Sequence, residues 1–386
     1  MRILVNAKDE KLLYKLKRIE GVSEVWPTAN VFDTNSEKSD LLIISDKQIE
    51  PEILPKIREF WAEKPVLYLL SNQSDSRITQ RAMSICDAHK IDFIPPQNSL
   101  IDIIEFVEEF YFNRKKVRTP IMTFVSGLPQ QGLTSTLLSI GKKLGQLSNA
   151  RIGIIGLNGW NSGYDLVDYN GKTLDELWDG LQAQSLRSDE LSEKSHCLSG
   201  NVRFLAGNRD RKMIYRYNVE GIAYLLQLAR QEYDLVLLDC GAYFDTAMAY
   251  QGINQSDVLV LHMTGMINHI NAFEEQYDQI LSRATRISKK QMLLLMNQVR
   301  EDPGLFKEKQ VSETLEIPLW SKIPFDNQFI HRIQKRNLEE LGNDYESSID
   351  RTSKLIVNMF KLPLIDSTIK AVPWYKRLGR RAGLST

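Results

Sequence analysis

The chain has few cysteines, no net charge and no long apolar run, and each absence excludes a class of protein. Its three cysteines, Cys86, Cys197 and Cys240, are scattered without a C-x-x-C pair, which indicates reduced cytosolic thiols and argues against a zinc site or a disulfide framework. The 49 basic and 49 acidic residues balance, so any nucleic-acid or membrane partner must use a local patch. No apolar run reaches the about 18–20 residues of a membrane span. The N-terminus, MRILVNAKDEK, lacks the apolar core of a signal peptide, so none is expected.

What is present is ordinary for a globular protein: 42% hydrophobic and 25% charged residues over 386 positions, a length typical of two or three domains. Apolar runs alternate with helical patterns, which predicts an α/β fold with two doubly wound parallel-sheet domains. We divide the chain into a first domain at 1–112, a basic linker at 113–119, a second domain at 120–360 and a tail at 361–386.

Short apolar runs predict the strands of both domains. In the first domain they are Arg2–Val5, Asp40–Ile44, Pro65–Leu70 and Ile91–Ile94. In the second domain most runs are continuously apolar, as strands buried on both faces of a parallel sheet should be. They are Ile121–Val125, Arg151–Ile155, Val202–Ala206, Leu235–Leu238, Val258–Leu261, Met292–Met296 and Leu319–Ile323.

One stretch of the second domain has the pattern of a phosphate-binding loop. The strand at Ile121–Val125 runs into a loop bounded by Gly127 and Gly132, and a helix opens at Thr134. This is the strand, glycine loop and hydroxyl-bearing helix start of a P-loop, G-x-x-x-x-G-K-[ST]. Glycines let backbone N–H groups face one concavity, and the helix N-terminus adds its positive end. The lysine is missing, because Leu133 stands in its place.

The first domain resembles the receiver domain of two-component response regulators in its order and size. A receiver is phosphorylated on an aspartate that ends its third strand. Here Ser45 has that position, and Asp46 comes one residue later, on the opposite face of a strand. Asn6-Ala7 and Pro95 replace the expected acidic pair and lysine. Without a carboxylate cluster there is no Mg²⁺ site, so the resemblance implies an atypical receiver with a role in interaction or dimerisation.

The second domain resembles the ParA/MinD family of deviant P-loop ATPases through four motifs in the family's order. They are SGLPQQGLTST, YDLVLLDCG, LLLMNQV and IPLWSKIPFD. An atypical receiver joined to such a domain resembles the TadZ/CpaE proteins of the Tad (Flp-type) pilus, many of which also lack the P-loop lysine. This resemblance covers nearly the whole chain. It implies a localisation factor that dimerises and recruits pilus machinery at the cytoplasmic face of the membrane.

The family motifs imply a role for each matching residue. Thr134 would give its hydroxyl to Mg²⁺, Asp239 would hold the Mg²⁺ shell from a strand end, and Asn297 would read adenine beside a proline loop. Each also has a purely structural interpretation, as a helix N-cap, a turn cap or a strand-end turn residue. The residues expected to contact ATP or ADP are Gly127, Gln131, Gly132, Leu133, Thr134, Ser135, Asp239, Asn297 and Pro324, with Thr134 and Asp239 on Mg²⁺.

Several positions depart from the family. Leu128 and Leu133 stand where the family has lysines, so neither can hold the β- and γ-phosphates. The loop centre at 129–131 reads PQQ where the family has glycines, and the sequence GLN at 156–158 replaces an aspartate-rich switch. Phosphoryl transfer depends on positioning and charge stabilisation, so we expect no hydrolysis of ATP and assign no catalytic residue. Nucleotide binding without turnover and an empty scaffold both stay open.

Two basic segments lie outside the domain cores. The linker reads NRKKVRTP, and the tail has no acidic residue after Asp366. On a helical wheel the tail places Trp374 and Leu378 on one face and most basic residues opposite, which is typical of a segment that lies on a membrane or docks a partner. A solvated linker and a solvated tail are the alternatives. The residues expected to contact membrane or partner are Trp374, Lys376, Arg377, Leu378, Arg380 and Arg381.

The leading hypothesis is a degenerate, non-hydrolysing ParA/MinD-like scaffold. It would dimerise and assemble a Tad-type pilus or related secretion machine at the cytoplasmic membrane face. One rival is an active, nucleotide-switched positioning or partition ATPase. Another is a regulatory nucleic-acid binder, which the balanced charge disfavours.

Overall fold

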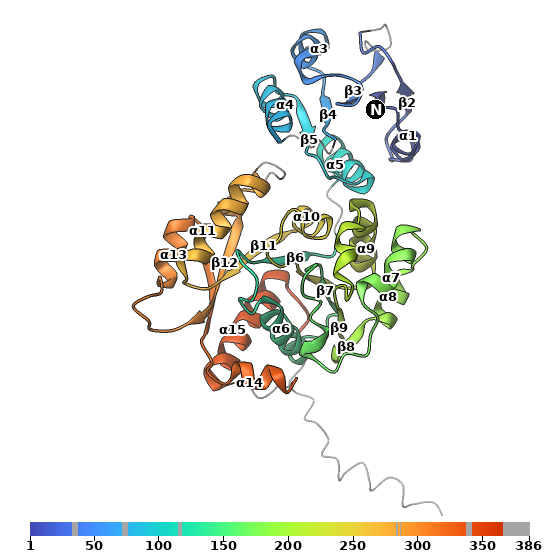
Figure 1. Cartoon of the computed structure of the whole chain (residues 1–386). Helices are drawn as coiled ribbons and strands as arrows, with labels where there is room; N and C mark the ends of the chain where they lie inside the picture. The colour runs from blue at the N-terminus through green and yellow to red at the C-terminus, as the bar shows by residue number, and fades with distance from the viewer. Residues whose placement is uncertain are drawn as a thin grey trace, which may run out of the picture.

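The described residues of the computed structural model form two α/β domains, each built on its own sheet (Figure 1). They are residues 1–32, 38–71, 76–114, 118–282, 285, 287–336 and 342–365. Hydrophobic side chains form two core clusters in each domain, and among these residues no cluster combines the two domains. The predicted fold class is confirmed, and the domain boundaries stay a prediction.

The first domain has a five-stranded parallel sheet in the order β2-β1-β3-β4-β5. Its strands are β1 (Arg2–Asn6), β2 (Glu24–Pro27), β3 (Leu41–Ser45), β4 (Val66–Leu69) and β5 (Asp92–Ile94). Its helices are α1 (Glu10–Lys17), α3 (Leu54–Trp61), α4 (Ser76–Ala88) and α5 (Leu100–Phe112). The apolar runs miss β2, because this edge strand buries only Val25.

The second domain has an eight-stranded sheet in the order β13-β12-β11-β6-β10-β7-β9-β8. Its strands are β6 (Ile121–Val125), β7 (Ile152–Gly156), β8 (His196–Ser199), β9 (Val202–Leu205), β10 (Leu235–Asp239), β11 (Val258–Met263), β12 (Met292–Val299) and β13 (Leu319–Pro324). Its helices are α6 (Leu133–Leu147), α7 (Leu174–Gln182), α8 (Ser188–Lys194), α9 (Val219–Glu232), α10 (Ala247–Asn254), α11 (Ile267–Gln276), α13 (Glu308–Leu315), α14 (Phe329–Gln334) and α15 (Asn343–Phe360). Strand β8 pairs antiparallel with β9. The apolar runs do not predict it, because it buries only Leu198.

Helix α6 lies against the sheet and is largely buried. Every residue from 133 to 141 is buried, and the helix also packs against α15. A Cβ at Gly141 would lie 2.3 Å from Cδ1 of Ile154 in β7, so the helix approaches the sheet too closely for a larger residue. This packing fixes the loop that precedes α6 at the carboxyl end of β6.

The first domain contacts the second through the start of α5 and through α10. Asp102 closes the α5 capping box by accepting from the N–H of Ser99 (2.6 Å). The same carboxylate accepts hydrogen bonds from Gln251 on α10 (3.0 Å) and from Gln255, the C-cap residue of that helix. Asp102, Gln251 and Gln255 are all buried, so one desolvated carboxylate both caps a helix and joins the domains.

The two basic segments are only partly described. In the linker, Arg114 pairs with Glu20 (3.1 Å) and Arg118 with Glu105 (3.0 Å), so these two cations are engaged within the chain. The predicted membrane or partner contacts in the tail, at 374–381, lie outside the described residues. Among the helices that the structure describes, none combines the length and the apolar character needed to cross a membrane.

Replacing Asp102 with alanine should lower the free energy of unfolding by about 2–4 kcal/mol, because α5 loses its cap and two buried glutamines lose a charged acceptor. Denaturant titration of the full chain measures this change. Glu109→Ala is the matched control, because Glu109 is exposed on the same helix, and it should change stability by less than about 0.5 kcal/mol. Equal effects of the two substitutions would show that the contact at Asp102 adds nothing.

Candidate functional site

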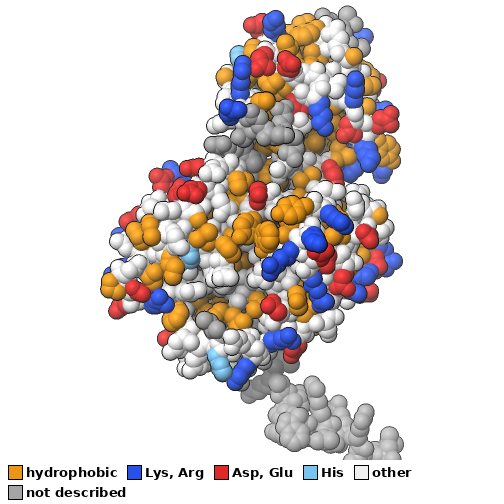
Figure 2. All heavy atoms as spheres, in the orientation of Figure 1, with side chains coloured by type: hydrophobic (Ala, Val, Ile, Leu, Met, Phe, Trp, Pro, Cys, Tyr) orange, Lys and Arg blue, Asp and Glu red, His pale blue; other side chains and the backbone are white. Residues whose placement is uncertain are grey.

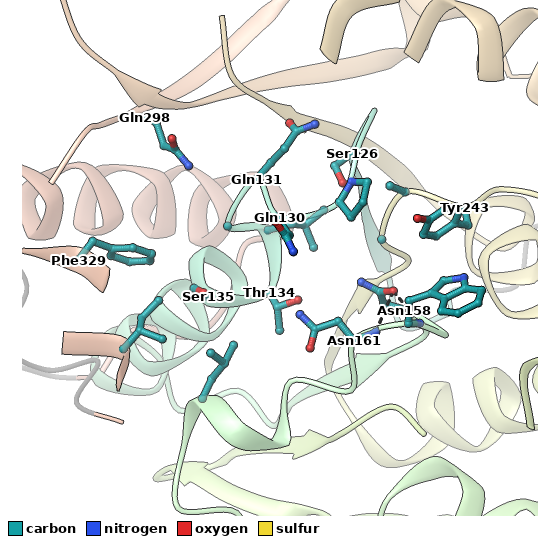
Figure 3. Close-up of a pocket in the computed structure, with 18 of the residues that line it drawn as sticks. Ser126, Gln130, Gln131, Thr134, Ser135, Asn158, Asn161, Tyr243, Gln298 and Phe329 are labelled. Atoms are coloured by element: carbon teal, nitrogen blue, oxygen red, sulfur yellow. Dashed lines mark hydrogen bonds between the residues drawn. The ribbon is translucent and has the colours of Figure 1, made fainter. Parts of the chain in front are cut away.

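A cleft opens at the carboxyl ends of the central strands of the second domain, where α6 begins. Its volume is about 650 Å³, and ligands of open α/β sheets bind at this edge of the sheet. Figure 3 shows the loop before α6 in the middle of the cleft, with Asn158 and Asn161 on one side and Gln298 and Phe329 on the other. The cleft therefore has the place and the size of a small-molecule site.

The loop from Gly127 to Gly132 is held in an unusual backbone conformation. Gly132 has a φ of 83° and Gln130 a φ of 64°, and the left-handed conformation costs a non-glycine residue about 1–2 kcal/mol. A Cβ at Gly127 would lie 2.6 Å from the carbonyl oxygen of His269, so glycine is required there. Strained backbone of this kind gathers at ligand-binding sites.

Leu133, at the position of the missing lysine, is the first residue of α6 and is buried. Its side chain belongs to the same hydrophobic cluster as Leu137 and Phe124, so it stabilises the core and brings no charge to the cleft that it borders. Leu128 is half-buried. Neither position where the family has a lysine can hold a phosphate by charge.

Thr134 and Asp239 meet directly at the bottom of the site. The hydroxyl of Thr134 donates to Oδ2 of Asp239, and the N–H of Gly241 donates to Oδ1 (3.1 Å). Asp239 ends β10 and is buried, and this desolvation raises its pKa to about 6, although the two hydrogen bonds act in the opposite direction. The structure thus brings together the two residues that the sequence assigns to Mg²⁺.

Thr134 and Asp239 have the chemistry that a magnesium ion requires. Mg²⁺ takes one or two protein oxygen ligands and completes its shell with water and substrate phosphates. Here one hydroxyl and one carboxylate lie in contact, and an ion between them would replace their mutual hydrogen bond. Within the described part of the chain no cluster of three or more carboxylate, histidine or cysteine groups forms a metal site, so these two residues alone would not complete a coordination shell. When bound, the ion would neutralise phosphate charge.

Asn297 lies against the loop before α6, and its expected contact with adenine stays a prediction. Its Nδ2 donates to the carbonyl of Gln131 (2.8 Å), and the residue is buried. Asn297 therefore holds the loop in place, while the neighbouring Gln298 lines the cleft. Pro324 ends β13 and is not among the described residues that line the cleft.

Several cleft residues were not predicted as contacts, and of the six named next only Gln298 lies within one of the four motifs, LLLMNQV. They are Trp160, Asn161, Arg211, Tyr243, Gln298 and Phe329. Each lies in a segment at the carboxyl end of a strand, so the rule that ligands bind at these ends could have indicated the segments. It could not have indicated the individual side chains. Trp160 and Tyr243 join two of these segments, with ring centroids 5.8 Å apart.

No protein-family model and no curated protein matches the chain, but solved structures do. It is similar to a ParA family ATPase from Chlorobium tepidum TLS, with a TM-score of 0.54 and 13% identity over 61% of this chain and 99% of that one. It is also similar to MinD from Pyrococcus horikoshii OT3 complexed with Mg-ADP (TM-score 0.52, 13% identity, 62% of this chain and 96% of that one). A third match is the MinC:MinD cell division protein complex of Aquifex aeolicus (TM-score 0.50, 13% identity, 62% and 96%).

At these identities the likeness shows the fold. The parallel sheet, the glycine loop and the helix that follows it define a domain with the P-loop NTPase fold. More particularly, it is the fold of the ParA and MinD ATPases, and the share of the chain that is matched has the size of the second domain.

The buried carboxyl group of Asp239 should make the free energy of unfolding depend on pH. Its folded-state pKa of about 6 lies above the unfolded value of about 3.9, so the native state keeps the proton longer. The carboxyl group of Asp239 therefore makes its full contribution to the free energy of unfolding below about pH 4. This contribution, about 3 kcal/mol, is lost as the pH rises through about 6. Asp239→Asn should remove this component, measured as the free energy of unfolding between pH 4 and 8.

The control for that experiment is Asp245→Asn, because Asp245 is exposed and follows in the same segment. It should keep the wild-type pH profile. If Asp239→Asn also kept the wild-type profile, the carboxyl group of Asp239 would not be the buried titrating group.

Proposed function

We propose that the chain is a localisation and assembly scaffold whose second domain holds a nucleotide without hydrolysing it. The observation that carries this proposal is Leu133, a buried apolar side chain at the position where a P-loop needs its lysine. Catalysis of phosphoryl transfer is almost entirely positioning and charge stabilisation. Among the described residues that line the cleft none is a carboxylate, so none can act there as a base for an attacking water.

ATP or ADP with Mg²⁺ is the ligand proposed for the cleft. The glycine loop, the start of α6 and the pair Thr134–Asp239 support it, because together they offer backbone N–H groups for phosphate and oxygen ligands for the ion. The similar MinD structure from Pyrococcus horikoshii contains Mg-ADP, which supports the same class of ligand here. Asn297 supports it indirectly by holding the loop.

We further propose that the first domain is an atypical receiver that serves as an interaction module. Its strand order, β2-β1-β3-β4-β5, is that of the doubly wound fold to which receivers belong. Ser45 ends β3, and Asp46 accepts hydrogen bonds from the N–H (2.7 Å) and the hydroxyl (2.9 Å) of Ser71. The carboxylate nearest the phosphorylation position therefore has a structural role.

The proposed partners are a second copy of the chain and the proteins of a Tad-type pilus or related secretion machine. The proposed place is the cytoplasmic face of the membrane, reached through the tail at 361–386. Figure 2 shows hydrophobic side chains on the surface of the second domain with Lys and Arg beside them. Trp160 and Tyr243, at the cleft, are each 41% exposed, and exposed apolar groups of this kind favour a protein partner. MinD of Aquifex aeolicus is found in complex with MinC, which supports a protein partner in general.

Two alternative functions remain. The fold supports an active positioning or partition ATPase as well as a scaffold. The emptied lysine positions, and the lack of a carboxylate among the described residues that line the cleft, favour the scaffold. A nucleic-acid binder has less support, because the described linker cations Arg114 and Arg118 already pair with carboxylates of the chain. Failure of the chain to retard DNA at low salt would remove this alternative.

With Mg-ATP, the full chain should release no phosphate above the rate of the Asp239→Ala variant, because no lysine stabilises the transferred phosphoryl group. A coupled phosphate-release assay measures this rate. Turnover by the wild-type chain that disappears in Asp239→Ala would overturn the scaffold proposal and establish the ATPase alternative.

The mass of the chain in solution should be that of a dimer and should not change when Mg-ATP is added, because a scaffold needs no nucleotide cycle to assemble. Light scattering coupled to gel filtration measures the mass with and without Mg-ATP. The ATPase alternative expects a monomer that dimerises only with Mg-ATP, and that result would favour it over the scaffold.

A further inference from the structure

Arg211 brings a positive charge to the cleft from outside every recognised motif. It begins the short 3₁₀ helix η3 (Arg211–Tyr215), where Asp210 accepts from the N–H of Lys212 (2.9 Å). Ile214 of the same turn is buried against Gly159, where a Cβ would lie 2.7 Å from it. This packing fixes η3 beside the segment after β7 that forms one side of the cleft. The position of Arg211 is therefore set by the fold and not by a loose loop.

Arg211 is also electrostatically distinct from the cations near it. Among the described residues that line the cleft it is the one charged side chain, and within that part of the chain no ion pair engages it. Arg209 instead stacks on Tyr164, with its guanidinium carbon 4.6 Å from the ring centroid, and Lys212 is exposed and does not line the cleft. A cation without a counter-ion at a cleft wall favours an anionic ligand.

A second observation points to a ligand in the same cleft. The side chain of Gln131 is 2% exposed and lines the cleft, yet neither its oxygen nor its nitrogen has a hydrogen-bond partner among the described residues. An unpaired buried amide is costly. Helix α6 is 15 residues long, and its N-cap residue Gly132 provides no side-chain cap. The first N–H groups of the helix are therefore also left for a ligand or water. Polar groups without partners thus lie in the cleft that Arg211 also lines.

The wall of the cleft formed by the start of α14 and the end of β12 has a different character. Phe329 and Gln298 line it (Figure 3), and an aromatic ring with an adjacent amide suits a flat heterocycle that stacks and hydrogen-bonds. The cleft therefore combines a cation from η3 and N–H donors at the start of α6 with aromatic side chains, which are Trp160, Tyr243 and Phe329. A ligand with an anionic end and an aromatic end matches this arrangement.

We propose that Arg211 replaces the missing P-loop lysine as the phosphate-binding cation, so that the cleft binds a nucleoside diphosphate or triphosphate with its terminal phosphate at Arg211. The inference deepens the nucleotide-holding part of the proposed function and rests on it. Arginine presents several N–H donors in one plane and binds phosphate in a bidentate manner. It comes from η3 and not from the glycine loop itself. That geometry holds a phosphate without restoring the P-loop lysine.

The test is equilibrium dialysis of the full chain with radiolabelled ADP, comparing wild type, Arg211→Ala, Arg211→Lys and Lys212→Ala. We expect Arg211→Ala to weaken ADP binding at least tenfold, Arg211→Lys to weaken it less, and Lys212→Ala to change it less than twofold. Adenosine, which lacks phosphate, should bind wild type and Arg211→Ala equally. Thermal unfolding of each variant checks folding, and because Arg211 is exposed no change in melting temperature is expected.

ADP binding that Arg211→Ala leaves unchanged would overturn the proposal. So would an equal loss of adenosine binding, because it would place the effect of Arg211 away from the phosphate. If wild type bound no ADP, the nucleotide-holding inference would be overturned, while the scaffold function would still stand or fall on the phosphate-release assay. The two failures are therefore distinguishable.

Discussion

The hydrogen bond between Thr134 and Asp239 joins the two elements on which the cleft depends. Thr134 lies in the first turn of α6 and Asp239 ends β10, and both are buried. With this bond in place the helix start stays at the sheet edge, and the loop before it keeps its two left-handed residues. Asn297 adds a second tie from β12 to the carbonyl of Gln131. Buried polar contacts thus hold the loop and the start of α6 at the sheet edge without a lysine.

The same strand connects the cleft to the first domain. After Asp239, the chain passes through Gly241 and Tyr243 at the cleft wall and then enters α10. Gln251 of α10 and Gln255, the C-cap residue of α10, donate hydrogen bonds to the buried Asp102 of the first domain. A ligand that moves the segment after β10 would therefore act on the element against which the first domain is held. This arrangement suits a scaffold in which one domain senses and the other presents a surface.

Much of this structure could be predicted from the sequence, for physical reasons that particular elements make clear. Central parallel strands such as β6 and β10 are buried on both faces and leave continuous apolar runs, whereas the edge strands β2 and β8 bury one residue each and leave none. The motifs predicted that Thr134 and Asp239 lie at one site. They did not predict the hydrogen bond between the two side chains, which depends on side-chain geometry. Asn297 was predicted to read adenine, and that stays a prediction; the bond from its amide to the carbonyl of Gln131 depends on side-chain geometry that the sequence does not indicate. Arg211 lies at the cleft because the neighbouring Ile214 packs against Gly159. No local sequence pattern indicates this contact.

The central claim is that a phosphate-shaped frame without a lysine still holds a nucleotide. Calorimetric titration of the full chain with ADP and with ATP, each with and without Mg²⁺, tests it most directly. The account predicts saturable one-site binding of both nucleotides, since the backbone donors of α6 and the cation at Arg211 remain. The absence of binding heat in all conditions, together with no protection of the chain against thermal unfolding by either nucleotide, would contradict it.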